Sequence, residues 1–280
     1  MPPMRRAMRW AILGAAAVLL LALLVVGVAM LVYPPRYLLR TIAWGDSDVG
    51  DIYRFPSRAL PASGHPTRFQ VAPDMAPARA ALQAAMGTAD LEAFLQRTGT
   101  QALLVLRGDT LLYEGYFNGA ARDTLVTSFS VVKSVDSALV GIALAEGKLH
   151  SLDDPVTRYL PELARRDPRF EHITLRHLVT MASGIRFAEQ HFITGDDART
   201  YYDPNLRAMT LATVRITGPP GERWLYNNYH PLLMGMILER ATGMSVTRYL
   251  NEKLWGGLGA EYDASFSLDS TEDGFEKMES

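Results

Sequence analysis

Residues 127–147 read Thr-Ser-Phe-Ser-Val-Val-Lys-Ser-Val-Asp-Ser-Ala-Leu-Val-Gly-Ile-Ala-Leu-Ala-Glu-Gly. Four apolar residues of this stretch recur at the spacing of one face of an α-helix, namely Val132, Val135, Leu139 and Ala143. Gly147 follows where a helix commonly ends. A polar stripe with the spacing i, i+3, i+4, i+7 comprises Ser130, Lys133, Ser134 and Ser137. Polar side chains along a helix that is otherwise apolar enough to be buried predict a cleft beside it.

Two β-rich runs precede this helix. Residues 101–106 (Gln-Ala-Leu-Leu-Val-Leu) and 110–117 (Thr-Leu-Leu-Tyr-Glu-Gly-Tyr-Phe) flank the turn residues Gly108-Asp109. Because such a turn between two β-rich runs is typical of a hairpin, we predict an antiparallel pair of strands here. Later signals, such as Thr174 as a cap and His230-Pro231 as a helix start, predict that the rest of the chain is mostly helical.

The N-terminus is a separate segment, because residues 10–33 carry no charge and are almost wholly apolar. As a helix they would span roughly 36 Å at about 1.5 Å per residue, more than a hydrocarbon core of about 30 Å. Arg5, Arg6 and Arg9 precede the run, and basic residues favour the cytoplasmic side. We therefore predict a cytoplasmic basic leader (1–9), a single transmembrane helix (10–33) in the inner (cell) membrane, and an extracytoplasmic, periplasmic domain. A cleaved signal peptide is the alternative, although its apolar region is typically only about 7–15 residues long.

Composition bounds the function of the remaining chain. The 280 residues include 28 Lys+Arg, 30 Asp+Glu and no cysteine, so the formal charge is 28 − 30 = −2. This balance excludes a nucleic-acid-binding protein driven by bulk charge, and the lack of cysteine excludes disulfides, a thiolate nucleophile and Cys-ligated zinc. A Pro-, Gly-, Asp- and Ser-rich stretch predicts an extended lead-in over residues 34–84, followed by one domain over 85–280.

Ser130 and Lys133 form the one pair that points to chemistry. The chain lacks His-Glu-x-x-His, Gly-x-Gly-x-x-Gly, Gly-x-x-x-x-Gly-Lys-Ser/Thr and Gly-x-Ser-x-Gly, so we predict no metal site and no cofactor. Residues at i and i+3 share a helical face, and a serine nucleophile needs an adjacent base. A lysine can be that base when partial burial and the positive end of the helix dipole lower its pKa. The alternative is a chance match in an ordinary helical turn with an exposed lysine.

Further segments follow this pair in order: Leu152-Asp-Asp-Pro-Val-Thr-Arg-Tyr-Leu-Pro-Glu-Leu, Thr174-Leu-Arg-His-Leu-Val-Thr-Met-Ala-Ser-Gly-Ile and Pro220-Gly-Glu-Arg-Trp-Leu-Tyr-Asn-Asn. With these segments, residues 85–280 resemble the serine β-lactamase and D-alanyl-D-alanine peptidase superfamily, especially its class C-like branch of esterases and amide hydrolases. The resemblance implies an α/β (α+β) fold of the β-lactamase/transpeptidase type. Such a fold has an antiparallel sheet flanked by helices plus a helical subdomain, here preceded by one transmembrane helix.

The second motif of that branch is Tyr-x-Asn, which this chain matches at Tyr116-Phe-Asn118, Tyr226-Asn-Asn228 and Tyr249-Leu-Asn251. Only Tyr226 lies after Ser130, behind a Pro-Gly turn and just ahead of a helix, where an irregular loop can aim a phenol into a cleft. We expect Tyr116 to be a strand residue and Tyr249 to lie late in a helix. The resemblance implies that Ser130 is the nucleophile, that Lys133 takes its proton and that Tyr226 passes a proton to the leaving group. It also implies that Asn228 hydrogen-bonds the substrate or Lys133, and that the substrate is a small-molecule amide or ester.

The chain departs from the superfamily in the third motif, Lys/His-Thr/Ser-Gly, which does not follow Tyr226. Its nearest string, residues 97–99 (Arg-Thr-Gly), precedes Ser130 instead, and residues 271–280 form a polar, aperiodic tail. We therefore expect a C-terminally truncated sequence in which the sheet and the oxyanion hole are incomplete. Two alternatives stay open: a catalytically silent, membrane-tethered binding domain on the same fold, and a structural membrane protein with a chance Ser-x-x-Lys string.

Overall fold

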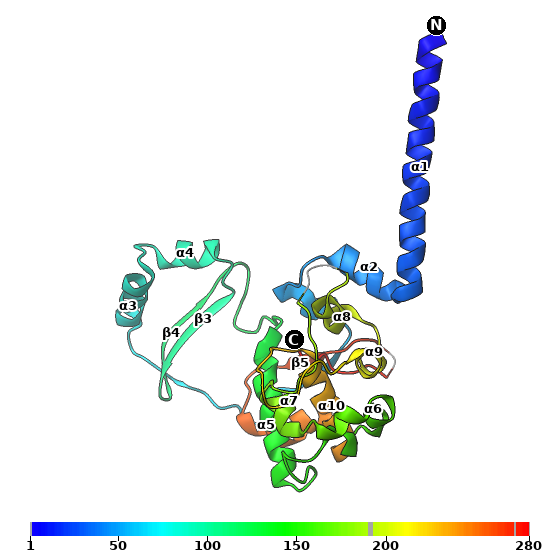
Figure 1. Cartoon of the computed structure of the whole chain (residues 1–280). Helices are drawn as coiled ribbons and strands as arrows, with labels where there is room; N and C mark the ends of the chain where they lie inside the picture. Colours follow the sequence, from blue (N-terminus) through cyan, green and yellow to red (C-terminus); the bar gives the residue numbers. More distant parts are fainter. Residues whose placement is uncertain (1, 190–192, 272, 280) are drawn as a thin grey trace.

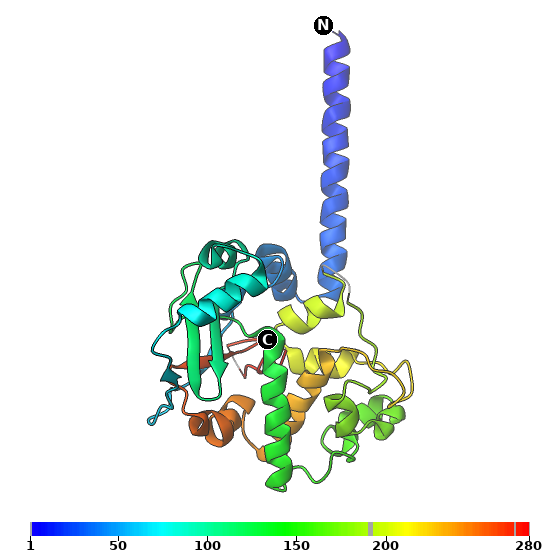
Figure 2. The same cartoon turned by 90° about the vertical axis from the view of Figure 1, so that its left-hand side faces the viewer.

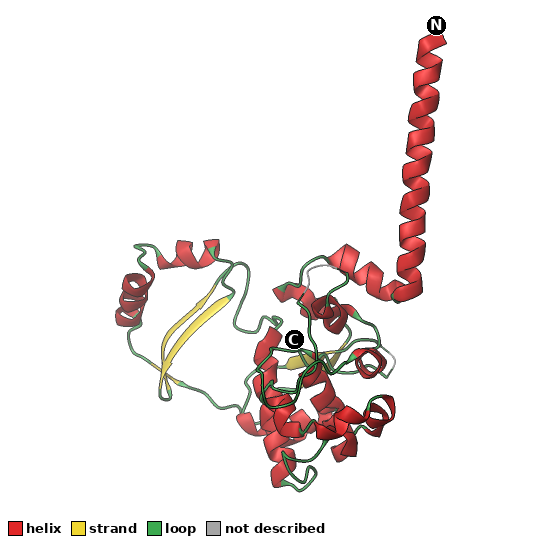
Figure 3. Ribbon diagram, in the orientation of Figure 1, coloured by secondary structure: helices red, strands yellow, loops and turns green. Residues whose placement is uncertain are grey.

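The computed structural model describes residues 2–189, 193–271 and 273–279, and it combines helices with short strands (Figures 1 and 3). The α-helices of this part are α1 (Pro2–Val32), α2 (Pro35–Trp44), α3 (Ala76–Met86), α4 (Leu91–Arg97), α5 (Val132–Ala145), α6 (Pro161–Arg166), α7 (Leu175–Val179), α8 (Asp196–Tyr202), α9 (Leu206–Thr213), α10 (Tyr229–Thr242), α11 (Val246–Leu250) and α12 (Gly256–Leu258). Its strands are β1 (Ser57–Leu60), β2 (Gln70–Val71), β3 (Ala102–Arg107), β4 (Thr110–Tyr116) and β5 (Ala264–Ser267). Single turns of 3-10 or π helix complete it, namely η1 (Val49–Tyr53), η2 (Phe129–Val131), η3 (Val156–Arg158), η4 (Pro168–His172) and η5 (Asn251–Trp255).

The predicted hairpin is confirmed. Strands β3 and β4 pair antiparallel, with Ala102 opposite Tyr116 and Arg107 opposite Thr110. The short β2 adds to β4 in parallel, which gives the order β2-β4-β3. Helices α3 and α4 lie on this sheet, and the shared core includes Leu91, Leu95, Tyr113 and Phe117. The hairpin and these two helices form a lobe of their own beside the helical body (Figure 1).

The helical body is built around α5 and α10. Helix α10 packs against α5, α7 and α9, and its residues 229–238 are all buried. In α5 the predicted apolar face is buried at Val132, Leu139 and Ala143. The predicted cap at Thr174 is also confirmed, since its hydroxyl accepts a hydrogen bond from the backbone N–H of His177 (3.4 Å) at the start of α7.

The predicted class of fold, a mixture of helices and antiparallel strands with a helical part, is confirmed. The strands nevertheless form two separate sheets. Besides β2-β4-β3, strand β1 pairs antiparallel with β5, with Ser57 opposite Ser267 and Leu60 opposite Ala264. The strands therefore do not form one closed sheet. Helix α5 and the helices packed against it lie beside the β1-β5 pair.

The stretch predicted to be an extended lead-in differs in the structure, because its first half is folded onto the domain. Helix α2 buries Tyr37, Leu38 and Arg40, and β1 is hydrogen-bonded to β5. Proline and glycine predict irregular chain, whereas here Pro35 stands in the first turn of α2, where a proline is compatible with a helix. Helix α1 projects from this body, and its residues Ile12–Val32 are long and apolar enough to cross a membrane (Figures 1 and 2). An N-terminal signal sequence has the same properties.

Candidate active site

Ser130 lies in η2, the tight turn that leads into α5, and its side chain is exposed. The chain enters this turn through Phe129, whose φ of +48° is unusual for an aromatic residue. Residues with such backbone strain persist only where their surroundings hold them, and they cluster at functional sites. Here η1 supplies that hold, because Thr127 donates its N–H to Val49 (2.9 Å) and accepts a bond from the N–H of Ile52 (3.0 Å).

The structure brings three of the four predicted site residues together. The amino group of Lys133 donates to Ser130 Oγ at 2.9 Å, and the hydroxyl of Tyr226 donates to the same oxygen at 2.6 Å. Lys133 Nζ lies 5.2 Å from the centre of the Tyr226 ring. Ser130 Oγ is therefore shared by an amine and a phenol, so that one group can take its proton while the other delivers a proton to a bound molecule.

The other two Tyr-x-Asn strings lie elsewhere. Tyr116 is in β4, where its hydroxyl bonds Glu114, and Tyr249 is in α11, where its hydroxyl donates to Glu146 (3.0 Å). These contacts agree with the prediction of a strand residue and a late helical residue. Of the three Tyr-x-Asn strings, the one that its position in the sequence favoured is the one whose tyrosine contacts Ser130.

The loop before α10 aims Tyr226, and Asn227 holds this loop in place. The buried Asn227 side chain donates to the carbonyl of Ile185 (3.0 Å) and accepts from the N–H of Tyr229 (2.9 Å). One residue before Tyr226, Leu225 donates its N–H to the carbonyl of Met181 (2.8 Å). The middle residue of the motif thus positions the tyrosine, a role that the sequence analysis did not assign.

Asn228, the fourth predicted residue, is half-buried at the start of α10. Its side-chain oxygen is buried and accepts no hydrogen bond among the described residues. No hydrogen bond between Asn228 and Lys133 is found among those residues either. Its side-chain oxygen is therefore buried without a partner, and its predicted contact with Lys133 is absent from this arrangement.

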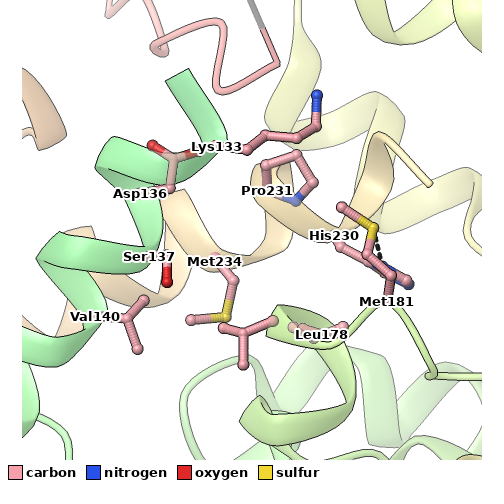
Figure 4. Close-up of a pocket in the computed structure, with 10 residues that line it drawn as sticks. Lys133, Asp136, Ser137, Val140, Leu178, Met181, His230, Pro231 and Met234 are labelled. Atoms are coloured by element: carbon pink, nitrogen blue, oxygen red, sulfur yellow. Dashed lines mark hydrogen bonds between the residues drawn. The ribbon is translucent and has the colours of Figure 1, made fainter. Parts of the chain in front are cut away.

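A cavity of about 60 Å³ lies beside Lys133 (Figure 4). Helix α5 contributes Lys133, Asp136 and Ser137 to it, and α10 contributes His230 and Met234 from the opposite side. Two residues of the polar stripe predicted along α5, Lys133 and Ser137, thus line this cavity. A volume of this size has room for a few water molecules only.

Asp136 is the residue of this cavity that the sequence analysis missed. It is 4% exposed, and neither carboxylate oxygen has a hydrogen-bond partner among the described residues. Burial raises the pKa of Asp136 well above its ordinary value, while the charge of Lys133 one turn earlier acts in the opposite direction. A signal was present in the sequence, because Asp136 occupies an apolar position between Val132 and Leu139 on the buried face of α5.

His230, across the cavity, is a neutral structural residue. Burial lowers its pKa to about 3, and Nε2 lies 2.6 Å from the hydroxyl of Ser183. Nδ1 lies 3.3 Å from the sulfur of Met181 (Figure 4). A histidine held in this way is part of the cavity wall, whereas the side chains that hydrogen-bond Ser130 Oγ among the described residues are Lys133 and Tyr226.

The predicted polar tail is also different in the structure, because residues 275–279 are buried beside the site. The carbonyl of Glu279 accepts a hydrogen bond from Lys133 (3.4 Å). Lys277 donates to the carbonyl of Tyr201 (2.5 Å), and burial lowers its pKa. Glu276 pairs with Arg58 of β1 at 2.7 Å. Contacts with distant parts of the chain bury this segment. Neither its polar composition nor its lack of periodicity predicts these contacts.

No cluster of three or more His, Cys, Asp or Glu side chains that could hold a metal ion occurs within residues 2–189, 193–271 and 273–279. The donors that surround Ser130 are an amine and a phenol. This arrangement suits acyl transfer to a serine hydroxyl, in which protons move but no metal ligands are needed.

Comparison with known proteins places the chain in a family. The family model described as Beta-lactamase matches residues 64–273, which is most of the chain. The 6-aminohexanoate-dimer hydrolase of Paenarthrobacter ureafaciens is 32% identical over 197 residues, which cover 66% of this chain and 49% of that protein. Esterase EstB of Burkholderia gladioli is 35% identical over 135 residues, or 44% of this chain and 33% of that protein.

A solved structure agrees on the fold. A Bacillus anthracis protein described as a 6-aminohexanoate-dimer hydrolase superimposes with a TM-score of 0.68 and 21% identity, covering 85% of this chain and 64% of that structure. The chain spans about half the length of the Paenarthrobacter relative. From the extent of the family match and the shared fold, the chain belongs to the beta-lactamase family.

Proposed function

We propose that this chain is the membrane-anchored part of a serine hydrolase that cleaves amide or ester bonds through an acyl-enzyme on Ser130. One observation carries the proposal: Ser130 Oγ lies within hydrogen-bond distance of both Lys133 Nζ (2.9 Å) and the Tyr226 hydroxyl (2.6 Å). The names of the two relatives, a 6-aminohexanoate-dimer hydrolase and an esterase, support the same class of reaction.

In the acylation step, Ser130 Oγ attacks the carbonyl carbon of the substrate, and its proton moves to the neutral amine of Lys133. A tetrahedral intermediate forms. Tyr226 then donates its phenolic proton to the leaving nitrogen or oxygen, the bond to that atom breaks, and the ammonium of Lys133 restores the proton to the phenolate. The products of this step are the released amine or alcohol and an ester on Ser130.

In the deacylation step, a water molecule attacks the ester carbonyl. The amine and phenol that served acylation now take the proton of the water and return one proton to Ser130 Oγ. The carboxylic acid leaves, and both side chains recover their starting protonation. This proposal assigns Asn228 a hydrogen bond with an N–H or O–H of the substrate, a contact for which its half-buried side chain must turn, because its oxygen is now buried without a partner among the described residues.

Helix α1 is the proposed anchor. Its residues Ile12–Val32 are uncharged, and none of them is buried by the rest of the protein, as expected of a helix that is surrounded by lipid. The preceding arginines place its N-terminus on the cytoplasmic side, so that the domain lies outside the cytoplasm, in the periplasm. Resistance of the full chain to extraction from membranes at alkaline pH tests this anchoring separately from the chemistry.

The test of the chemistry is covalent labelling of the full chain in detergent with a fluorophosphonate probe, followed by intact-protein mass spectrometry. Ser130→Ala should abolish the mass shift, and Ser134→Ala, a change at an exposed serine one turn later, should leave it intact. Lys133→Arg should also abolish labelling, because a guanidinium stays protonated and cannot act as the base. A folded wild-type chain that never labels would favour the silent binding domain, and labelling that survives Ser130→Ala would rule out this nucleophile.

A further inference from the structure

Helix α2 has an unusual distribution of side chains. It begins three residues after the end of α1, and it buries Tyr37, Leu38, Arg40 and Thr41 against the domain. Its large apolar residues Leu39 and Ile42, however, are 67% and 66% exposed. A surface helix in water normally keeps its large apolar residues on the buried face, as α2 does with Leu38, and leaves charged and polar residues outside. The outer face of α2 is therefore suited to apolar surroundings.

The inner face of α2 is held firmly to the domain. The guanidinium of Arg40 donates to the carbonyls of Tyr202 (3.1 Å) and Asp269 (2.7 Å), and the hydroxyl of Tyr37 donates to the carbonyl of Ile193 (2.5 Å). Phe55 stacks its edge against Trp44 of the helix, with ring centroids 5.0 Å apart. These buried contacts fix which face of α2 is turned outward, so the exposure of Leu39 and Ile42 cannot be relieved by rotation of the helix.

The position of α2 relative to α1 indicates what its outer face contacts. The pair Pro34-Pro35 interrupts the helix, because a proline disfavours helical geometry in the residue before it. Helix α2 then leaves the end of α1 at an angle (Figures 1 and 2). The half-buried aromatic residues Tyr33 and Trp44 lie at its two ends, and the exposed Arg36 lies beside Leu39. Tyrosine, tryptophan and arginine beside a membrane span are typical of the zone between lipid headgroups and acyl chains.

We propose that the outer face of α2, formed by Leu39 and Ile42, lies in the interfacial layer of the bilayer that α1 crosses. This inference rests on the proposed anchoring by α1, and it adds that the hydrolase domain is seated on the lipid surface rather than suspended from a flexible tether. An amphipathic helix in this position buries its apolar face about 5–10 Å into the boundary between headgroups and chains. Because Arg40 and Tyr37 attach α2 to the domain, the domain that carries Ser130 then has a fixed orientation relative to the membrane.

The absence of cysteine from the chain allows a direct test with single-cysteine variants. Leu39→Cys and Ile42→Cys report on α2, Val25→Cys reports on α1, and Leu106→Cys on β3 serves as a control that is 40% exposed. Each full-length variant is labelled with bimane and reconstituted in vesicles of phosphatidylethanolamine and phosphatidylglycerol. Fluorescence quenching is measured with iodide in the water and, separately, with lipids that carry a nitroxide near the headgroup. Far-ultraviolet circular dichroism in detergent verifies that each variant is folded.

The proposal predicts that iodide quenches the probes at Leu39 and Ile42 at least about threefold less than the probe at Leu106, because insertion by about 5–10 Å removes them from the water. Nitroxide lipids should quench both α2 probes and spare the control. If the Val25 probe is in lipid while both α2 probes are quenched by iodide like the control, α1 is an anchor but the surface proposal is wrong. If the Val25 probe is itself in water, the anchoring proposal fails first, and this inference fails with it. Protection from iodide without quenching by nitroxide lipids would mean that a protein surface, such as a second copy of the chain, covers α2, and would also overturn the proposal.

Discussion

Replacement of Tyr226 by Phe is the sharpest test of how the site handles protons. The change removes one hydroxyl, whose hydrogen bond in the structure is the 2.6 Å contact with Ser130 Oγ. The ring stays beside Lys133, and the loop keeps the Asn227 contacts that position it. Since a single hydrogen bond of a half-exposed group is lost, the free energy of unfolding should fall by no more than about 1.5 kcal/mol.

The expected effect on catalysis is larger and depends on the leaving group. General acid–base catalysis by a positioned side chain contributes about 10²–10⁴-fold, or roughly 3–5 kcal/mol of transition-state stabilisation. If Tyr226 protonates the leaving group, hydrolysis of a p-nitroanilide should lose about that full factor in kcat/KM, which covers the steps up to acylation and so excludes deacylation. Hydrolysis of a p-nitrophenyl ester should lose only about tenfold, because p-nitrophenolate leaves without a proton. Both substrates are assayed on the same preparations, with the slope of kcat/KM against leaving-group pKa as the readout.

Tyr249→Phe is the matched control, because it removes a hydroxyl from another Tyr-x-Asn string. That hydroxyl bonds Glu146 rather than Ser130, so both activities should be retained and only stability should change. Equal losses for the anilide and the ester in Tyr226→Phe would show that the phenol does not protonate the leaving group. Unchanged activity with both substrates would refute the assignment of Tyr226 to the site altogether.

Three further predictions concern stability, each measured by urea unfolding of the full chain in detergent. Because burial raises the pKa of Asp136, the folded state favours the protonated acid. The corresponding stability is fully present below the ordinary pKa of about 4 and is lost as the pH rises towards the folded-state value. Asp136→Asn should therefore gain stability relative to wild type as the pH is raised from 4.5 to 8, whereas a constant difference would contradict the buried, unpaired carboxylate. Arg40→Met should lower the free energy of unfolding by about 1–3 kcal/mol, because two backbone carbonyls lose their buried donor. Failure to detect any loss would mean that α2 is not docked as described. Thr174→Ala should cost about 1 kcal/mol by removing the cap of α7, and Thr174→Ser should restore most of it.

Local signals predicted the parts of this fold that depend on neighbouring residues. The hairpin at residues 102–116 follows from two β-rich runs and a Gly-Asp turn, and α5 follows from its apolar period. Lys133 reaches Ser130 because one helical turn separates them, which is a property of the helix alone. The structure differs from two local predictions. The first half of the lead-in and the tail after β5 were expected to be irregular chain, but contacts with distant segments bury parts of both.

The sequence by itself determined the candidate nucleophile and its neighbouring amine, the apolar N-terminal helix and the resemblance to a hydrolase superfamily, because each is encoded in short spacings and in composition. Only the tertiary structure brings Tyr226 into contact with Ser130, since the two are 96 residues apart and meet through a loop that is held by Asn227. The same holds for the buried carboxylate of Asp136 and for the exposed Leu39 and Ile42 of α2. Burial depends on contacts between segments that lie far apart in the chain. The sequence alone therefore does not show that Asp136 is buried without a partner or that Leu39 remains exposed.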